Sequence, residues 1–367
     1  MAEIESTEPK APLEQKREKA PLPDSPILLG WLRQMMLIRE FEVRTMQAYQ
    51  NRQIGGFCHI YIGQEAIAVG SIAAVNPDDP VVLAYRDHGH ALARGMDPKY
   101  CMAEMFGKIG GCAKGKGGSM HMFDAQHYLY GGHGIVGAQT PLGTGLAFAT
   151  KYEDEVIGEG KSDKVTLCYL GDGAINQGAF YEAMNLAGLF DIPVIFVLEN
   201  NRYSMGTAIE RGTTMAHALN AKSEAHGIEH AIIDGKNVMN MYEDFKPIAD
   251  WCREESRPFF VEAQTYRYKG HSMSDPRKYR TKMEEEMEEQ DDCIASLSTY
   301  LQEHHEVEPD AIKQLARQVK SQVRQAVEWS NQSPETPIDE LYTDVYTDAW
   351  GPFKGTSKPE MLQGEDE

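Results

Sequence analysis

The chain has 367 residues, of which 41% are hydrophobic and 25% are charged, a composition typical of globular proteins with enough length for a large core. Its formal net charge is -20, and an acidic surface of this kind argues against nucleic acid as the main partner. No apolar run approaches the roughly 18 residues that a membrane span needs. We therefore expect neither a nucleic-acid nor a membrane partner.

Six cysteines are scattered without a Cys-x-x-Cys pair, so the sequence suggests neither a disulfide framework nor a zinc knuckle, and a reducing cytosol fits. Residues 1–25 mix acidic, basic and proline residues, unlike a secretory signal or a mitochondrial presequence. We interpret them as a flexible tail. The expected organisation is a tail over 1–25, one domain over 26–345 and a second tail over 346–367, with a bacterial-type cytoplasmic location.

The first predicted element is a helix that starts at Ser25, a capping hydroxyl followed by proline at the first helical position, and runs to about Gln50. Apolar side chains repeat at helical spacing along it. Glycine-rich stretches over 107–119 and 131–137 predict two loops. Further helices are predicted over 64–75, 142–151 and 180–189, and strands over 81–85, 165–170, 194–198, 230–233 and 259–265.

Strands that alternate with helices predict an α/β fold with a parallel sheet and helices on both faces. After about Asp275 the sequence becomes charged and helical, notably between Asp310 and Trp329. We expect this part to form an outer helical layer and not a second catalytic domain.

Polar residues follow two neighbouring strands of the predicted sheet. Asp172 lies between two glycines after the first strand, and Glu199-Asn200-Asn201 ends the second. Ligands bind at the carboxyl ends of parallel strands, and these oxygen-bearing side chains suit a magnesium ion that also holds diphosphate oxygens. The helix after Gly173 would point its N-terminal amides at the same anion. A simple turn with an Asp cap remains an alternative for Gly-Asp-Gly taken alone.

The complete pattern of strand, Gly-Asp-Gly, helix, strand and Asn-Asn resembles the thiamine diphosphate signature. Other blocks extend the resemblance over roughly residues 30–345 to the alpha subunits of the thiamine diphosphate-dependent two-oxoacid dehydrogenases, and within them to the pyruvate branch. They are FCHIYIGQEA (57–66), YRDHGH (85–90), GGCAKGKGGSMHMF (110–123), GIVGAQTPLGTG (134–145), GDGAINQGAFYEAMNLA (171–187), ENNRYSMGT (199–207) and TYRYKGHSMSDP (265–276).

The resemblance implies a role for particular residues. Asp172, Asn201 and the backbone carbonyl of Tyr203 would hold magnesium, and His59 and His271 would be active-site histidines suited to proton transfer. The implied cofactor-binding residues are Tyr85, Arg86, Gly134, Val136, Asp172, Gly173, Ala174, Asn201, Arg267 and His271.

The other polar residues of these blocks carry less specific expectations. Ser272 and Ser274 fall in the loop that kinases phosphorylate in mitochondrial relatives, although nothing in the sequence shows that the source has such a kinase. His88, His90, His121 and His133 could be either site residues or satisfied polar residues of the core and loops.

The implied activity is oxidoreductase chemistry: decarboxylation of pyruvate on thiamine diphosphate and Mg²⁺, followed by transfer of the two-carbon unit to the lipoyl group of the dihydrolipoamide acetyltransferase. In families with this cofactor, a glutamate that helps to activate it sits on a second α/β domain. One such sheet uses nearly all of this chain, so we expect that a separate beta subunit supplies it, in an α2β2 heterotetramer.

Two other functions are weighed against this one. A sibling enzyme that acts on branched-chain oxoacids or on acetoin would share the cofactor motif, but the SMHMF, SMGTAIER and HSMSDP blocks favour the pyruvate branch. A non-catalytic nucleotide-binding protein would need a G-x-G-x-x-G that opens a βαβ unit, or a Walker loop, and the chain has neither.

Overall fold

The computed structural model describes residues 17–158 and 163–345. Its centre is a six-stranded sheet in the order β2-β1-β3-β4-β8-β7, and every strand pair in it is parallel. Its strands are β1 (Val81–Ala84), β2 (Leu129–His133), β3 (Thr166–Gly171), β4 (Val194–Asn200), β7 (Glu229–Asp234) and β8 (Phe259–Gln264). A separate two-stranded hairpin consists of β5 (Tyr203–Ser204) and β6 (Thr207–Ala208).

Eleven α-helices occur in the described part of the chain, and short 3-10 or π turns connect several of them. The α-helices are α1 (Ser25–Gln50), α2 (Glu65–Ala73), α3 (His88–Ala93), α4 (Pro98–Met105), α5 (Gln139–Tyr152), α6 (Gly178–Leu189), α7 (Ile209–Gly212), α8 (Val238–Glu255), α9 (Lys282–Glu288), α10 (Cys293–His305) and α11 (Pro309–Gln332). The short turns are η1 (Gly118–Met120), η2 (Ala125–His127), η3 (Glu153–Ile157), η4 (Ala174–Asn176), η5 (Asn220–His226), η6 (Glu289–Asp291) and η7 (Ile338–Tyr342).

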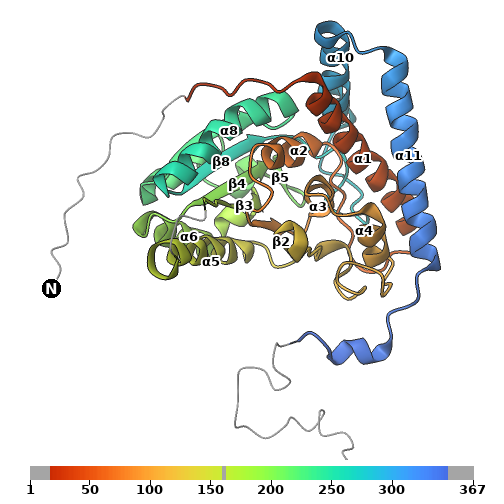
Figure 1. Cartoon of the computed structure of the whole chain (residues 1–367), viewed down its shortest axis with the longest axis horizontal. Helices are drawn as coiled ribbons and strands as arrows, with labels where there is room; N and C mark the ends of the chain where they lie inside the picture. The colour runs from red at the N-terminus through yellow and green to blue at the C-terminus, as the bar shows by residue number, and fades with distance from the viewer. Residues whose placement is uncertain (1–16, 159–162, 346–367) are drawn as a thin grey trace, which may run out of the picture.

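The strands alternate their side chains between two hydrophobic cores, as strand geometry requires. In β3, Leu167 and Tyr169 join the larger core with α1, α2 and α8, whereas Cys168 and Leu170 join the smaller core with α5 and α6. Figure 1 accordingly shows the sheet between α8 with α2 on one face and α5 with α6 on the other. The predicted parallel α/β fold with helices on both faces is confirmed.

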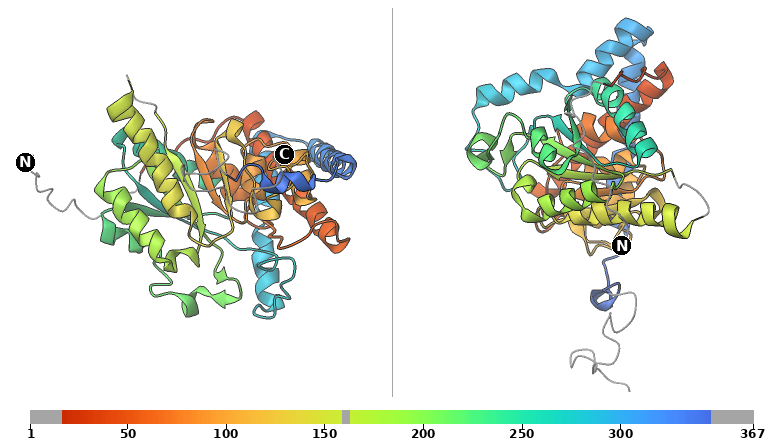
Figure 2. Two further views of the ribbon diagram at one scale, coloured as in Figure 1. Left: turned by 90° about the horizontal axis from the view of Figure 1, so that it is seen from below. Right: turned by 90° about the vertical axis from the view of Figure 1, so that its left-hand side faces the viewer.

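The outer helical layer is also present. Helix α1 packs against α10 and α11, and α11 packs against α4. The left panel of Figure 2 places the olive α5 and the blue α11 at opposite sides of the molecule. The predicted helix over 310–329 thus corresponds to α11.

Three local predictions need correction. Helix α1 does begin at Ser25, but Asp24 and not Ser25 is its N-cap residue, and Asp24 makes no side-chain capping hydrogen bond. The stretch over 131–137 is not entirely loop, because Leu129–His133 forms β2 at the edge of the sheet. The segment between β1 and the loop at 107–119 contains α3 and α4, which the sequence analysis did not predict.

The described part of the predicted N-terminal tail lies against the domain. Arg17 donates to the Glu229 carboxylate at 2.7 Å, and the amide of Ala20 donates to the Glu243 carbonyl at 2.9 Å. Residues 1–16 and the predicted tail over 346–367 lie outside the described residues, so the predicted domain limits stay a prediction. All six cysteines are free thiols, and none of the helices described here is both long and apolar enough to cross a membrane.

Candidate active site

The candidate site lies at the carboxyl ends of β3 and β4, where the chain passes into η4 and the β5–β6 hairpin. Asp172 directly follows β3 and is only 3% exposed. Its Oδ1 accepts a hydrogen bond from Ser204 Oγ at 3.0 Å, but its Oδ2 is buried without a partner in the described chain. Burial raises the pKa of this carboxyl group, and the nearby Ser204 hydroxyl and Arg267 charge only partly oppose that shift.

Asn201 and Tyr203 lie beside Asp172, as predicted, and the Arg267 side chain connects them. Arg267 is 1% exposed, and its Nη1 donates to Asn201 Oδ1 at 3.3 Å and to the Tyr203 carbonyl at 3.2 Å. Its Nη2 donates to the Met205 carbonyl at 3.1 Å. The guanidinium therefore contacts two of the three predicted metal ligands and shapes the turn that carries them.

Glu199 does not take part in this oxygen cluster, although the sequence analysis grouped it with the metal-type ligands at the end of its strand. Its side chain accepts a hydrogen bond from Tyr61 Oη at 2.5 Å and lies 3.2 Å from His90 Nε2. Asn200 likewise turns away, since its Nδ2 donates to Glu262 at 2.8 Å. Alternation along β4 sends Glu199 and Asn200 in opposite directions, each to its own buried partners, and Asn201 lies beyond the end of the strand.

A second cluster brings together His59, Tyr85, Arg86 and His271. The ring of His59 lies 4.5 Å from that of Tyr85 and 5.1 Å from that of His271. Arg86 is 6% exposed, and it donates to the carbonyls of Ile60 at 2.6 Å and His271 at 2.8 Å. It thus fixes the backbone next to both histidines.

Both histidines are kept neutral by their surroundings. Burial is the main cause, and the positive charge of Arg86 adds to it, so the pKa of His59 falls to about 2 and that of His271 to about 3. The positive charge of Arg267 acts on both rings in the same direction. A neutral imidazole has a nitrogen that can accept a proton, and Nδ1 of each ring is buried without a hydrogen-bond partner in the described chain.

The segment with Gly134 and Val136 borders the turn after Asp172. A Cβ on Gly137, which has a φ of +86°, would lie 2.9 Å from the Gln177 side chain, and its next contact is the Ala174 carbonyl at 3.6 Å. A Cβ on Gly134 would lie 3.4 Å from the His121 ring, and Val136 is 41% exposed. Gly173 packs against the β5–β6 hairpin, because a Cβ added to it would lie 2.4 Å from Ser204 Oγ. That these residues bind a cofactor stays a prediction.

Buried polar residues that the sequence analysis did not single out support the histidine cluster. Glu42 of α1 accepts a hydrogen bond from the Tyr61 amide at 2.8 Å and lies 3.1 Å from His88 Nδ1. Nε2 of His88 lies 2.9 Å from Ser119 Oγ, which also accepts the amide hydrogen of His59 at 3.3 Å. Burial lowers the pKa of His88, but the charge of Glu42 and the hydrogen bond to it, together with Asp87 and the Ser119 carbonyl, raise that pKa overall.

A sequence signal for Glu42 existed. It lies seven residues after Met35, so it falls on the apolar stripe of α1, where a charged residue needs a buried partner. His88 and His90, considered as weak site candidates, prove to belong to this supporting layer: both are buried beneath the site. His121 Nδ1 donates to the Gly132 carbonyl at 2.8 Å, and His133 lies partly exposed near Tyr130.

The fold and the site define a parallel α/β protein with room for an anionic ligand at the carboxyl ends of β3 and β4, where ligands bind in such sheets. Comparison with known families identifies the family. Residues 33–339 match the model of the family described as "Dehydrogenase E1 component". This chain belongs to that family, so the resemblance found in the sequence is confirmed.

Relatives with curated names agree over most of the chain. A protein of Rickettsia bellii named "Pyruvate dehydrogenase E1 component subunit alpha" is 46% identical over 312 residues, which cover 85% of this chain and 93% of the relative. One of Rhizobium meliloti with the same name is 45% identical, with 85% and 88% covered. A mitochondrial one of Sminthopsis macroura is 41% identical, with 87% and 85% covered.

Proposed function

We propose that this chain is the alpha subunit of the decarboxylase component of a pyruvate dehydrogenase complex. With a beta subunit it would decarboxylate pyruvate on thiamine diphosphate and pass the acetyl unit to a lipoyl group, in the cytoplasm. The family membership and the names of the relatives support this proposal. Within the structure, the buried and unpartnered Asp172 Oδ2 at the carboxyl end of β3 is the observation that carries it.

The residues at Asp172 fit a magnesium ion. The carboxylate of Asp172, the amide oxygen of Asn201 and the main-chain carbonyl of Tyr203 are hard oxygen ligands of the kind that Mg²⁺ prefers. A cation beside Asp172 would satisfy its free oxygen and favour its charged form, which burial alone disfavours. No cluster of three or more His, Cys, Asp or Glu side chains suited to a metal occurs among the described residues, but the proposed set needs only one carboxylate.

The cofactor would lie between the two clusters. Arg267 and Arg86 bring positive charge to the diphosphate side with Tyr85, while Gly173 and Ala174 offer amides at the start of η4. Gly134 and Val136 border the other end. Thiamine diphosphate, when bound, supplies the electron sink that makes loss of carbon dioxide from pyruvate possible.

The histidines would position the substrate and handle protons. Because the pKa values of His59 and His271 are lowered, both rings are neutral at pH 7 and would serve as hydrogen-bond donors or acceptors toward the substrate. Either ring would take up a proton only where negative charge on the bound cofactor or substrate raises its pKa. The backbone of His271 is held by Asp275, whose Oδ2 accepts its amide hydrogen at 2.6 Å. Phosphorylation of Ser272 or Ser274 stays a prediction; their hydroxyls are exposed and 3.0 Å apart, so a kinase could reach them.

A beta subunit would bind on the outer face of α5 and α6. Helices α5 and α6 lie side by side and turn a row of apolar side chains outward: Leu142, Phe148, Leu186, Leu189 and Phe190 are between 45% and 67% exposed. Gly134 and Val136 precede α5 by a few residues in the chain, so a subunit that covers this row would approach the proposed cofactor. Exposed apolar patches of this size are typical of interaction surfaces.

Calorimetry of thiamine diphosphate binding, with and without Mg²⁺ and with the beta subunit present, tests the anchor. We expect Asp172→Asn to weaken the magnesium-dependent binding by about 100-fold or more, because loss of a supporting residue alone costs about 10- to 100-fold at metal sites. Asp310→Asn, an exposed aspartate at the start of α11, is the matched control. Undiminished binding by Asp172→Asn would contradict the proposed site.

The substrate is tested separately by steady-state decarboxylation with pyruvate and 2-oxoisovalerate. We expect a higher kcat/KM for pyruvate. Preference for 2-oxoisovalerate would instead favour the branched-chain sibling considered in the sequence analysis, for which the relatives reported above give no support.

A further inference from the structure

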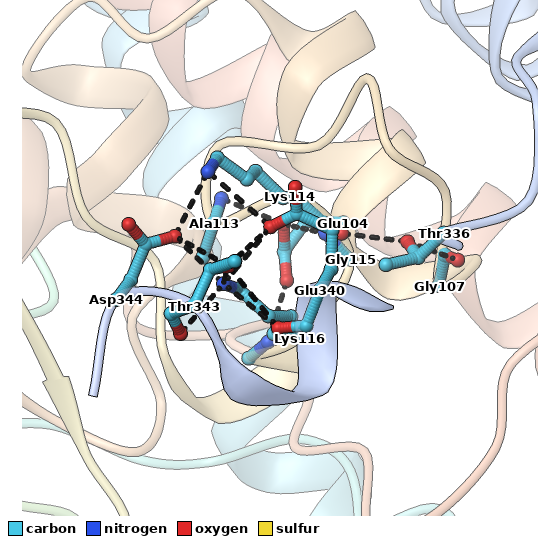
Figure 3. Close-up of polar contacts among 11 residues, drawn as sticks. Glu104, Gly107, Ala113, Lys114, Gly115, Lys116, Thr336, Glu340, Thr343 and Asp344 are labelled. Carbon is cyan, nitrogen blue, oxygen red and sulfur yellow. Dashed lines mark hydrogen bonds and ion pairs between the residues drawn. The ribbon is translucent and has the colours of Figure 1, made fainter. Parts of the chain in front are cut away.

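The glycine-rich loop over 107–118 is organised around one buried carboxylate. Glu104, at the end of α4, is fully buried and accepts four backbone hydrogen bonds from this loop. The amides of Ala113 and Gly115 donate to Oε2 at 2.7 and 2.8 Å, and those of Gly117 and Gly118 donate to Oε1 at 2.7 and 3.1 Å. Figure 3 shows the carboxylate of Glu104 enclosed by the loop.

The segment that follows α11 runs along the outside of the same loop; we call residues 333–344 the C-terminal strap. The Ile109 amide donates to the Pro334 carbonyl at 3.1 Å, and Lys108 and Glu335 form an antiparallel bridge. The Thr336 hydroxyl lies 3.0 Å from the Gly107 carbonyl and 2.6 Å from the Lys114 carbonyl. The strap therefore joins the start of the loop to its middle.

Two glycines let the strap approach this closely. A Cβ on Gly115, whose φ is +75°, would lie 2.6 Å from Thr336 Oγ1 and 2.5 Å from the Gly107 backbone. A Cβ on Gly110 would lie 2.6 Å from the Trp329 ring and 2.7 Å from Ser333 Oγ. The glycine content of the loop thus has a packing reason at these positions, besides any contact with a ligand.

Charges strengthen the contact at its outer edge. Lys116 Nζ lies 2.7 Å from Asp344 Oδ2 and 3.3 Å from Glu340 Oε2, and Lys114 Nζ lies 2.9 and 3.3 Å from the same two atoms (Figure 3). Exposed ion pairs contribute little singly. The two lysines and the two carboxylates form one network, in which the carboxylates offset the repulsion between the lysines.

The loop leads directly to the histidine cluster. The residue after it, Ser119, accepts the amide hydrogen of His59 and lies against His88, as described above. A few residues on, the Met122 amide donates to Asp87 Oδ2 at 2.8 Å. The loop thus spans the distance between the strap on the outside and the backbone of His59 on the inside.

We propose that the C-terminal strap is a positioning device for His59: it fixes the glycine-rich loop from outside, as Glu104 does from inside, and so holds Ser119 against the His59 amide. Ser119, Glu104 and the strap are positioning residues in this arrangement. The effect of the strap on the loop is independent of the proposed function, and only its effect on turnover rests on that function.

Hydrogen exchange of the loop amides, measured on the complex with the beta subunit, tests the first part. A chain that ends after Gln332 lacks the strap, and a chain that ends after Val345 keeps it. We expect the amides of Ala113, Gly115, Gly117 and Gly118 to exchange about tenfold faster in the first chain only, with β3 and β4 unchanged. Unchanged exchange of the loop would overturn the proposal, because Glu104 alone would then suffice.

Point variants keep the test valid if the shortened chain misfolds. Thr336→Val removes the hydroxyl at constant shape, and Thr336→Ser retains it. We expect the valine variant to raise loop exchange about fivefold, the effect of losing about one hydrogen bond. With pyruvate it should lower kcat several-fold at unchanged affinity for thiamine diphosphate, and the serine variant should restore both loop exchange and kcat.

The two readouts separate the two ideas. Faster loop exchange with unchanged kcat would show that the strap holds the loop without positioning His59, and would overturn the positioning role. If the unaltered chain does not bind thiamine diphosphate, the proposed function is contradicted, but the exchange result for the loop is unaffected.

Discussion

At the scale of single residues, His59 makes stability depend on pH in a predictable direction. Its folded-state pKa of about 2 lies below the ordinary value of 6.5, so the unfolded chain binds a proton between these values and the folded chain does not. The stability that comes from keeping His59 neutral is therefore present above pH 6.5 and is lost as the pH falls below it.

Replacing this histidine should flatten the acid side of the stability profile. When the pH falls from 7.5 to 5, we expect the unaltered chain to lose about 1–2 kcal/mol more unfolding free energy than His59→Asn. Urea unfolding at the two pH values measures this change. His304→Asn, at an exposed position near the end of α10, is the control. If both chains lose the same unfolding free energy, the His59 ring takes up its proton in the folded chain as readily as in the unfolded chain, and the prediction is wrong.

At the scale of elements, helix α5 depends on close approach to the sheet. A Cβ on Gly143 would lie 2.8 Å from the Cβ of Cys168 in β3, whereas nothing lies within 4 Å of a Cβ on Gly145 of the same helix. We expect Gly143→Ala to lower the unfolding free energy by about 1–3 kcal/mol, because the helix must move off a packed core.

Gly145→Ala is the matched control for this prediction. It should raise stability by up to about 1 kcal/mol, since alanine favours a helix over glycine and meets no obstacle within this chain. Urea denaturation of both variants gives the comparison. If both glycines tolerate alanine equally, the tight packing of α5 on β3 is not what fixes this helix.

The sequence predicted elements where periodicity was strong and missed them where it was not. The apolar runs of β3, β4 and β8 and the helical spacing in α1 identified those elements almost to the residue. Strand β2 was read as loop because LYGGH contains two glycines, and only its place at the sheet edge beside β1 makes it a strand. The N-cap of α1 was misplaced by one residue, an error that propensity alone cannot correct.

At the scale of the whole molecule, the sequence predicted candidate site residues but not how they group. Asp172 and Asn201 could be placed together because parallel strands end at one edge. That His59, Tyr85 and His271 share a cluster depends on loops far apart in the chain, which no local pattern encodes. Glu199 was misassigned for the same reason, since its partners Tyr61 and His90 come from other segments.

The proposed subunit interface leads to the last prediction. Leu189, at the end of α6, is 67% exposed and lies in the apolar row of α5 and α6 beside Phe190. A buried interface centre tolerates a charge poorly, because the carboxylate loses its hydration without gaining a partner. We therefore expect Leu189→Glu to weaken binding of the beta subunit by about 30-fold or more, equal to the 2 kcal/mol typical of an interface hot spot.

Ile27→Glu is the matched control, because Ile27 is 52% exposed at the start of α1, on an element outside the proposed interface. Co-purification of tagged alpha chain with the beta subunit, followed by light scattering, measures the assembly. The fold of the variant is checked by its urea midpoint. Because Gly134 and Val136 lie just before α5 in the chain, loss of assembly should abolish tight thiamine diphosphate binding as well. If the Leu189→Glu chain assembles normally, the beta subunit binds elsewhere on the molecule, whether or not the cofactor binds.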